Sequence, residues 1–255
     1  MKMVAFFKKE LTENIRNRRL LILLIVTVLL SILGPAIALL TPKLVEYLAE
    51  DMAQSGIVLV TTEVTAMDSW TQYFKNLPIL VIVLLVMWSG SFTTEYQKHS
   101  LVPLVTKGLS KTVVYVAKML TLFLFWSVLY GLFFGISYGY NGYYWSNAGV
   151  SNIGTAVILY WLFGVWLIAL TGFFSAIADN AYTVLLGVGA VYLLSVFLAM
   201  VPTLAKKVPS ALSGGLSLMN STASPKDFLV AVVVTIMMIA GFTAGGIALF
   251  QKKDI

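Results

Sequence analysis

Residues 94–118, TEYQKHSLVPLVTKGLSKTVVYVAK, separate two segments that are too apolar to be anything other than membrane spans. This connector holds a single acid, Glu95, and four bases, which are Lys98, Lys107, Lys111 and Lys118. Pro103 and Gly108 interrupt it, and this predicts one or two short helices with a turn between them. A polar connector of this kind lies in water, where it can contact a soluble partner. The alternative is an ordinary solvated loop whose lysines only follow the charge bias of membrane topology.

The composition around the connector is that of a membrane protein. Of the 255 residues, 59% are hydrophobic and only 11% are charged, whereas about a quarter of a soluble domain is charged. The apolar residues fall in blocks long enough to cross a hydrocarbon core of about 30 Å. We therefore expect an all-α membrane protein that consists of one transmembrane domain, residues 1–255.

Six of these blocks are predicted spans, at roughly 20–40, 77–94, 115–140, 152–176, 182–201 and 227–250. If the N-terminus is inside, twelve of the 17 Lys and Arg residues lie on the inner side, as the positive-inside rule requires. Both termini are therefore expected in the cytoplasm. The 41–76 segment is expected to be an outer loop with a short helix after Pro42. The 202–226 segment is expected to form short helices that dip into the outer leaflet.

Residues 1–19, MKMVAFFKKELTENIRNRR, predict a helix that lies in the membrane interface. Its apolar residues recur every four positions and form one stripe, which consists of Met3, Phe7, Leu11 and Ile15. Polar and charged residues occupy most of the remaining surface, so the bases can face lipid phosphates of the bilayer. The alternative is a basic tail that only sets the topology of the first span.

Glycines four positions apart form rows in the third and sixth predicted spans: Gly131, Gly135 and Gly139, and then Gly241 and Gly245. Such rows let helices approach closely, either within the chain or between two copies of it. Charge is scarce by comparison, because Lys118 is the one ionisable residue between the predicted span ends. Ion-coupled carriers and voltage sensors need such residues. The energy for any transport is therefore expected to come from outside the bilayer.

Several chemistries are excluded by residues that the sequence lacks. The chain has no cysteine and a single histidine, His99, so neither a thiolate nor a histidine-based zinc site can form. The nearest approach to a phosphate-binding loop, GLSKT at 108–112, has Ser110 where that motif requires glycine. We expect no enzyme activity and no bound cofactor. The net charge of +6 lies beside the spans, where lipid and topology account for it, so no nucleic-acid partner is expected.

Taken together, the N-terminal helix, the connector and the six spans resemble the small six-span permease subunits of ATP-binding-cassette exporters. The residues that carry the resemblance are Glu95, the turn at 98–101, LVTK at 104–107, Ser110, Lys111, Lys118, Asn180 and the sequence FQKKDI at 250–255. The sequence departs from the family at Lys98 and His99, where members commonly carry Gly-Thr. The resemblance implies a multi-pass protein of a bacterial plasma membrane.

In that family the connector carries a coupling helix, a short helix that sits in a groove of a cytoplasmic ATPase. The resemblance implies two ATPase subunits, which bind ATP and Mg, and a second permease copy that is identical or a sibling. It assigns ATPase coupling to Glu95, Gln97, Lys98, Leu101, Leu104, Val105, Lys107, Ser110 and Lys111, and a second inner elbow to Asp179 and Asn180. Glu95 is also expected to position the coupling helix by pairing with a base of the N-terminal helix.

The expected activity is ATP-driven export of a hydrophobic or amphipathic substrate, because the second to fifth spans are rich in aromatic residues. Antimicrobial peptides, lipid-like molecules and hydrophobic drugs all fit this description, although the same aromatics could instead face lipid or the packed core. Two other functions stay open. One is a non-exporting membrane module for immunity or sensing, and the other is an intramembrane enzyme, for which the spans lack paired polar residues.

Overall fold

The computed structural model describes residues 2–53, 63–98, 101–106 and 108–253, without the side chains of residues 2, 48–53, 104 and 105. All regular structure in these residues is helical. The elements are α1 (Lys2–Arg16), α2 (Arg19–Ala53), α3 (Ala66–Gln97), α4 (Val102–Thr106), α5 (Lys111–Tyr144), α6 (Ile153–Ile177), α7 (Ala181–Ala199), the 3₁₀ helix η1 (Pro209–Ser213), α8 (Gly215–Met219), the 3₁₀ helix η2 (Pro225–Phe228) and α9 (Leu229–Lys252).

Six helical segments among the described residues are long and apolar enough to cross a membrane. They are Arg19–Tyr47, Ala66–Gln97, Lys111–Tyr144, Ile153–Ile177, Ala181–Ala199 and Pro225–Lys252. The expectation of an all-helical chain with six candidate spans is confirmed, and these spans indicate a multi-pass membrane protein.

Three helices extend beyond the predicted ends of the first three spans. α2 continues through Pro35 and Pro42 to Ala53, so the helix expected after Pro42 is the last part of α2. Membrane helices tolerate proline because neighbouring groups and local adjustments satisfy the freed backbone. α3 begins at Ala66 rather than at residue 77, because Thr65 and Asp68 form a capping box in which Thr65 N donates to Asp68 Oδ2 over 2.8 Å. α5 likewise continues past residue 140 to Tyr144.

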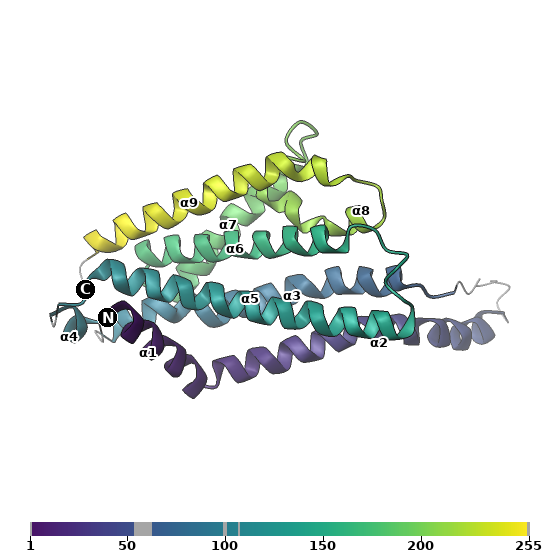
Figure 1. The fold of residues 1–255 in the computed structure, drawn as a ribbon, viewed down its shortest axis with the longest axis horizontal. Coiled ribbons are helices and arrows are strands. Elements are labelled where there is room, and N and C mark those ends of the chain that lie inside the picture. The colour runs from purple at the N-terminus through teal and green to yellow at the C-terminus, as the bar shows by residue number, and fades with distance from the viewer. Residues whose placement is uncertain (1, 54–62, 99–100, 107, 254–255) are drawn as a thin grey trace.

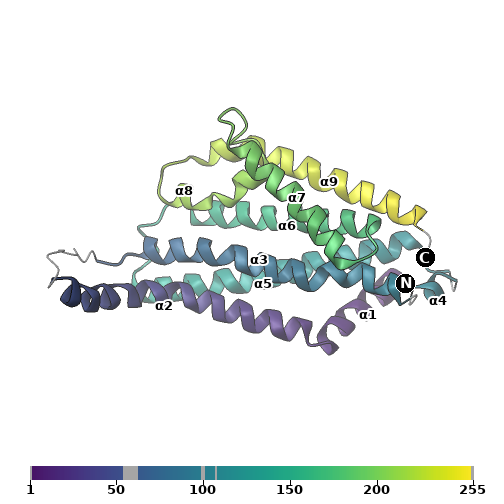
Figure 2. The ribbon, with the colours of Figure 1, turned by 180° about the vertical axis from the view of Figure 1, so that it is seen from behind.

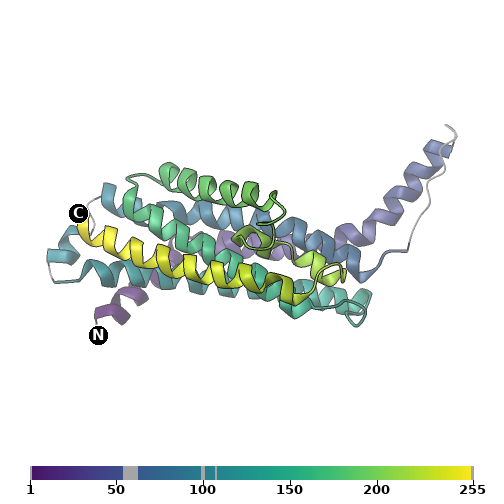
Figure 3. The ribbon, with the colours of Figure 1, turned by 90° about the horizontal axis from the view of Figure 1, so that it is seen from above.

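α2 lies along one edge of the helical bundle and α9 along the opposite edge, with α3, α5 and α6 between them (Figure 1). α2 packs on α3 and α5, whereas α9 packs mainly on α6. α7 packs on α3 and α6 and is best seen from behind (Figure 2). The outer part of α2 leaves the bundle (Figure 3). The predicted short helices between residues 202 and 226 are confirmed by η1, α8 and η2.

Aromatic side chains fill the core of the bundle, and glycines on facing helices make room for them. The fully buried tryptophans include Trp70, Trp88, Trp126 and Trp166. A Cβ atom at Gly164 would overlap the ring of Trp126, and one at Gly187 would overlap the ring of Phe174. These glycines let an aromatic ring lie directly against a helix backbone, as small residues do in membrane bundles.

The predicted glycine rows make fewer such contacts. A Cβ at Gly131, Gly135, Gly139 or Gly241 would meet no other described residue within 4 Å. Gly245 does face a ring, because its Cβ would lie 3.2 Å from Phe173 of α6. The first four positions therefore face open space in the described chain, and their packing between two copies stays a prediction.

Candidate functional site

One end of the bundle carries both termini, α4 and the segments that the sequence singles out (Figure 1). Four regions meet there: α1, the connector, the elbow between α6 and α7 (residues 178–180), and the C-terminal tip of the described chain (residues 250–253).

α1 docks on α5 and α2 through a face that differs from the predicted apolar stripe. The buried residues of this face are Phe6, Glu10 and Asn14. In the predicted stripe, Phe7 and Leu11 are half-buried and Ile15 is 58% exposed. A largely polar row thus attaches the helix to the bundle, while part of the apolar row stays free, as expected for a helix at a membrane interface.

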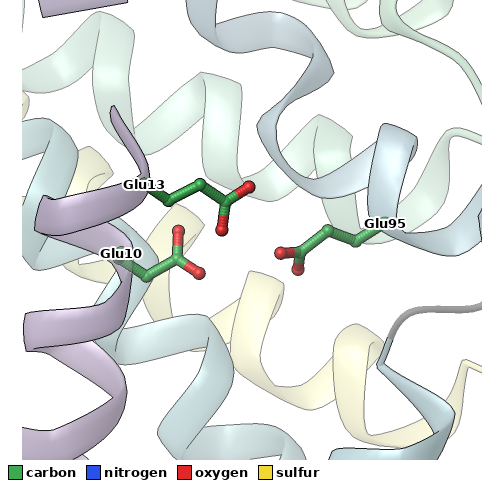
Figure 4. Close-up of side chains that lie close together, drawn as sticks. All are labelled: Glu10, Glu13 and Glu95. Carbon is green, nitrogen blue, oxygen red and sulfur yellow. The ribbon is translucent and has the colours of Figure 1, made fainter. Parts of the chain in front are cut away.

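Glu10 belongs to a cluster of five charged side chains, the ionic cluster: Lys9, Glu10 and Glu13 from α1, Glu95 from α3 and Lys118 from α5. Lys118 Nζ lies 3.0 Å from Glu10 Oε2 and 3.0 Å from Glu95 Oε2. Lys9 Nζ lies 3.1 Å from Glu10, 2.8 Å from Glu13 and 3.0 Å from Glu95. Figure 4 shows the three carboxylates converging from α1 and α3.

Three members of the ionic cluster are shielded from solvent, whereas the side chains of Lys9 and Glu13 are partly exposed. The side chains of Lys118 and Glu10 are 2% and 4% exposed, and that of Glu95 is 12% exposed. Charges this deeply buried are tolerated when they are paired and hydrogen-bonded. The expected pairing of Glu95 with a base of the N-terminal helix is confirmed, and the base is Lys9.

The same helices correct the expectation that Lys118 is the one ionisable residue inside the spans. Because α3 is longer than predicted, it includes Asp68 and Lys75 near its start and Glu95 near its end. These residues lie toward the ends of the helix, where lipid headgroups and water are close.

Two residues of α1 have shifted pKa values. Burial alone would raise the pKa of the Glu13 carboxyl, but the hydrogen bond and charge of Lys9, aided by Lys118 and Arg19, lower it below its usual value. Burial opposes the charged form of Lys9, but the hydrogen bond to Glu13 and the charges of Glu10 and Glu95 raise its pKa above the usual value. Both side chains are therefore charged at neutral pH.

The three carboxylates of the ionic cluster lie close enough together to be considered as a metal site. Oxygens of Glu10, Glu13 and Glu95 lie within 4.8 Å of one another. However, Lys9 and Lys118 already pair with these oxygens, so a cation would have to displace two ammonium groups. We assign the cluster a structural role, in which it fixes α1 and α5 to the end of α3.

The connector continues from the ionic cluster into the short helix α4. α3 ends at Gln97, and α5 begins after its N-cap residue Ser110. Between them Leu101 is buried, Val102–Thr106 forms α4 as predicted, and Gly108 adopts a φ of 82°, which glycine does without strain. Of the predicted coupling residues, Lys107 lies outside the described residues, and so do the side chains of Leu104 and Val105.

The elbow between α6 and α7 contacts the connector directly. Asn180 is the N-cap of α7, and its Oδ1 accepts a hydrogen bond from Thr183 N over 2.9 Å. The backbone carbonyl of Asp179 accepts a hydrogen bond from Gln97 Nε2 over 3.1 Å. The structure thus brings the two predicted inner regions together through Gln97 and Asp179.

Sequence reasoning missed Glu10, and it noted Phe250 and Lys253 only as part of the terminal sequence that carries the family resemblance, without predicting their contacts. Phe6, Glu10 and Asn14 have the same four-residue spacing as the apolar stripe, so periodicity could have found their row. For Lys253 the local sequence offers no such signal, because Lys252 beside it has the same chemistry.

The fold defines an all-helical membrane protein with six candidate spans. Comparison of the chain with models of known protein families finds no match, and comparison with curated proteins finds none either.

Proposed function

We propose that the chain is the transmembrane subunit of an ATP-binding-cassette exporter, driven by ATP that separate cytoplasmic subunits hydrolyse. The observation that carries the proposal is the position of α4 (Val102–Thr106), which lies past the ends of the long helices on the side of both termini (Figure 1). Pro103 and Thr106 are exposed there. The basic residues of α1 and the connector favour the cytoplasm for this side, where a soluble partner can reach α4.

The flanks of α4 attach it to two spans, so a force on α4 is passed to the bundle. Leu101 is buried in a cluster that includes Phe92 of α3 and Val114 of α5. The ionic cluster joins the same two helices through Glu95 and Lys118 over 3.0 Å. Movement of α4 by a partner would therefore displace α3 and α5 as rigid bodies.

The distribution of charge supports an external source of energy. Among the described spans, Asp68 and Lys75 lie near the start of α3, and Glu95 and Lys118 pair at the opposite end of the bundle. Ion-coupled transport requires ionisable groups along a path through the membrane interior. In the described helices these groups lie toward the two ends, which favours ATP hydrolysis by a partner as the driving reaction.

A cavity in the bundle supports a hydrophobic or amphipathic substrate, such as a peptide, a lipid-like molecule or a drug. It lies between α3, α6 and α7 and has a volume of about 480 Å³. Ligand sites commonly have about 300–1,000 Å³ and apolar walls with a few polar groups. The walls here include Phe74, Val81, Leu85, Phe163 and Leu167, and the lining also includes the polar residues Tyr160, Tyr192 and Ser213.

The proposal is tested by purifying the tagged chain from its native membrane and measuring bound ATPase. We expect an ATPase to co-purify with the unchanged chain. Thr106→Asp should lower the amount of bound ATPase about tenfold or more, because a carboxylate on α4 would be desolvated in the interface. The matched control is Thr203→Asp, at an exposed threonine in the connection after α7, and it should retain the ATPase.

Two outcomes would contradict the proposal. One is a preparation that exports its substrate with no ATPase bound. The other is equal retention of an ATPase by Thr106→Asp and Thr203→Asp, which would place the contact away from α4.

A further inference from the structure

The C-terminal tip, residues 250–253, lies between the connector and the elbow and contacts both. It consists of the last residues of α9 and its C-cap residue Lys253, and the sequence indicates only that it is basic and resembles the end of the exporter permeases. Its contacts form a chain of side-chain-to-backbone bonds that joins three helix ends.

Lys253 is bonded to the end of α6. Its ammonium donates to the carbonyl oxygen of Ala178 over 2.7 Å and approaches that of Ile177 at 3.4 Å. It also lies 3.0 Å from Asp179 Oδ1 and 4.4 Å from the ring centre of Tyr96. The last carbonyls of a helix lack intrahelical partners and carry partial negative charge, so a lysine there satisfies them.

The helix-end contacts matter more than the ion pair. The Asp179 side chain is 90% exposed, and exposed ion pairs contribute little because water screens them. The Lys253 side chain is itself only 14% exposed, so its hydrogen bonds to the α6 carbonyls are less screened.

The tip is held in the same way from the other side, by the first turn of α5. Lys111 Nζ donates to the carbonyl oxygen of Lys253 over 2.6 Å and to that of Gln251 over 3.3 Å. Gln251 Nε2 donates to Thr112 Oγ1 over 2.7 Å. Lys111 thus satisfies the end of α9, while Lys253 of the tip satisfies the end of α6.

The buried ring of Phe250 holds the tip in place, so the hydrogen bonds of Lys111 and Lys253 connect to a segment that is packed against the bundle. Its ring is 0% exposed and lies 5.8 Å from Phe92, 5.8 Å from Tyr96 and 5.7 Å from Tyr115, measured between ring centres. Because Phe250 is packed among α3 and α5, a displacement of α5 carries the tip with it.

We propose that Lys253 is a positioning residue that transmits movement of the connector to the elbow between α6 and α7. The route runs from Lys111 at the start of α5, through the tip, to the carbonyls of Ile177 and Ala178. The parallel contact from Gln97 to Asp179 is one hydrogen bond from a neutral amide, whereas Lys253 supplies a charged donor. This inference rests on the proposed function, because that function supplies the force on α4.

The test measures movement at both ends of the route. The chain has no native cysteine, so spin labels can be attached at introduced cysteines without other changes. One pair, Leu120 and Leu44, reports on α5, which carries the tip; the other, Tyr182 and Leu21, reports on the elbow, and all four positions are exposed. In the complex with its ATPase, pulsed EPR distances are compared with and without ATP.

In the unchanged chain we expect ATP to shift both distances. In Lys253→Met, which keeps an unbranched side chain but removes the charge, the Leu120 pair should keep its shift and the Tyr182 pair should lose most of it. Lys252→Met is the matched control, because Lys252 is the exposed neighbour, and both shifts should persist. Lys253→Arg keeps the charge and should restore the Tyr182 shift at least in part.

Each other result contradicts the inference, and each does so for a different reason. If Lys253→Met retains both shifts, Lys253 transmits nothing. If it loses both, the residue is needed for the movement of α5 itself and not for transmission. A complex of the unchanged chain that shows no ATP-dependent shift of the Leu120 pair contradicts the proposed function, and the inference with it.

Discussion

Lys118 shows how a charge is accommodated inside an apolar bundle. It is 2% exposed and is surrounded by acceptors from two other helices, namely Glu10, Glu95 and the carbonyl oxygen of Ser91 at 3.1 Å. Removing one member of a buried ion pair leaves its partner charged and desolvated, and this is more harmful than the loss of the attraction itself.

We therefore expect Lys118→Met to lower the free energy of unfolding by about 3–5 kcal/mol. The measurement is thermal unfolding in detergent, compared with Lys8→Met, which removes an exposed lysine of α1. Adding Glu10→Gln to Lys118→Met should recover part of the loss, because one unpaired carboxylate is then neutral. Equal destabilisation by Lys118→Met and Lys8→Met would contradict the structural role of the cluster.

At the scale of residues, the sequence predicts that a charged side chain needs an ion-pair partner, but it does not predict which residue that partner is. Glu95 is an acid beside a membrane span, so its pairing with a base of α1 is predictable. The choice of Lys9 over Lys8 depends on how α1 is rotated against the bundle. Similarly, Gly164 and Gly187 are unremarkable in sequence, because their role depends on rings from other parts of the chain.

α1 is attached to the bundle through charge, so its attachment should depend on pH. The folded state lowers the pKa of Glu13, mainly because Lys9 outweighs the effect of burial. The stability from this lowered pKa is present above the usual value of 4.5 and is lost as pH falls through the lower folded-state value.

Labels at Thr12 and Lys98 would report on this attachment by pulsed EPR. We expect the distance distribution to broaden as pH falls below the usual Glu13 value, and the pH response to be smaller in Glu13→Gln. Glu46→Gln, which alters an exposed acid of α2, should respond as the unchanged chain does. The same pH response in Glu13→Gln and the unchanged chain would exclude Glu13 as the source.

The elements themselves are predictable to differing degrees. Pro and Gly signals predict α4 and the short helices between residues 202 and 226, because these residues break helices in water. The same reasoning fails for α2, which continues through Pro42. The start of α3 was missed because the signal of its cap, Thr65 and Asp68, lies in a segment read as a polar loop.

The whole molecule places both described chain ends at the same end of the bundle, as an even number of spans requires (Figure 1). Because basic residues gather there, we expect this end in the cytoplasm. In intact cells a membrane-impermeant thiol reagent should label Tyr143→Cys at the opposite end and leave Lys98→Cys unlabelled. Both should be labelled after permeabilisation. Labelling of Lys98→Cys from outside would reverse the orientation.

At this scale the composition and apolar blocks predict the class of protein, because a bilayer restricts the choice to closed structures such as helices. The assembly of the candidate site is not predictable in the same way. Lys111 and Lys253 are 142 positions apart, and their contact depends on how α5 and α9 are placed side by side. No local pattern in the sequence contains that information.

The outer part of α2 determines which part of the protein is reached first from the opposite side of the membrane. With 35 residues and a rise of about 1.5 Å per residue, α2 is about 50 Å long, whereas the hydrocarbon core is about 30 Å thick. Its last turns therefore stand clear of the lipid, away from the rest of the bundle (Figure 3). With the basic end in the cytoplasm, as we expect, an antibody, a protease or a large solute outside the cell would encounter this rod before any other described helix, which would make its exposed positions, such as Lys43 and Glu46, suitable places for an epitope graft.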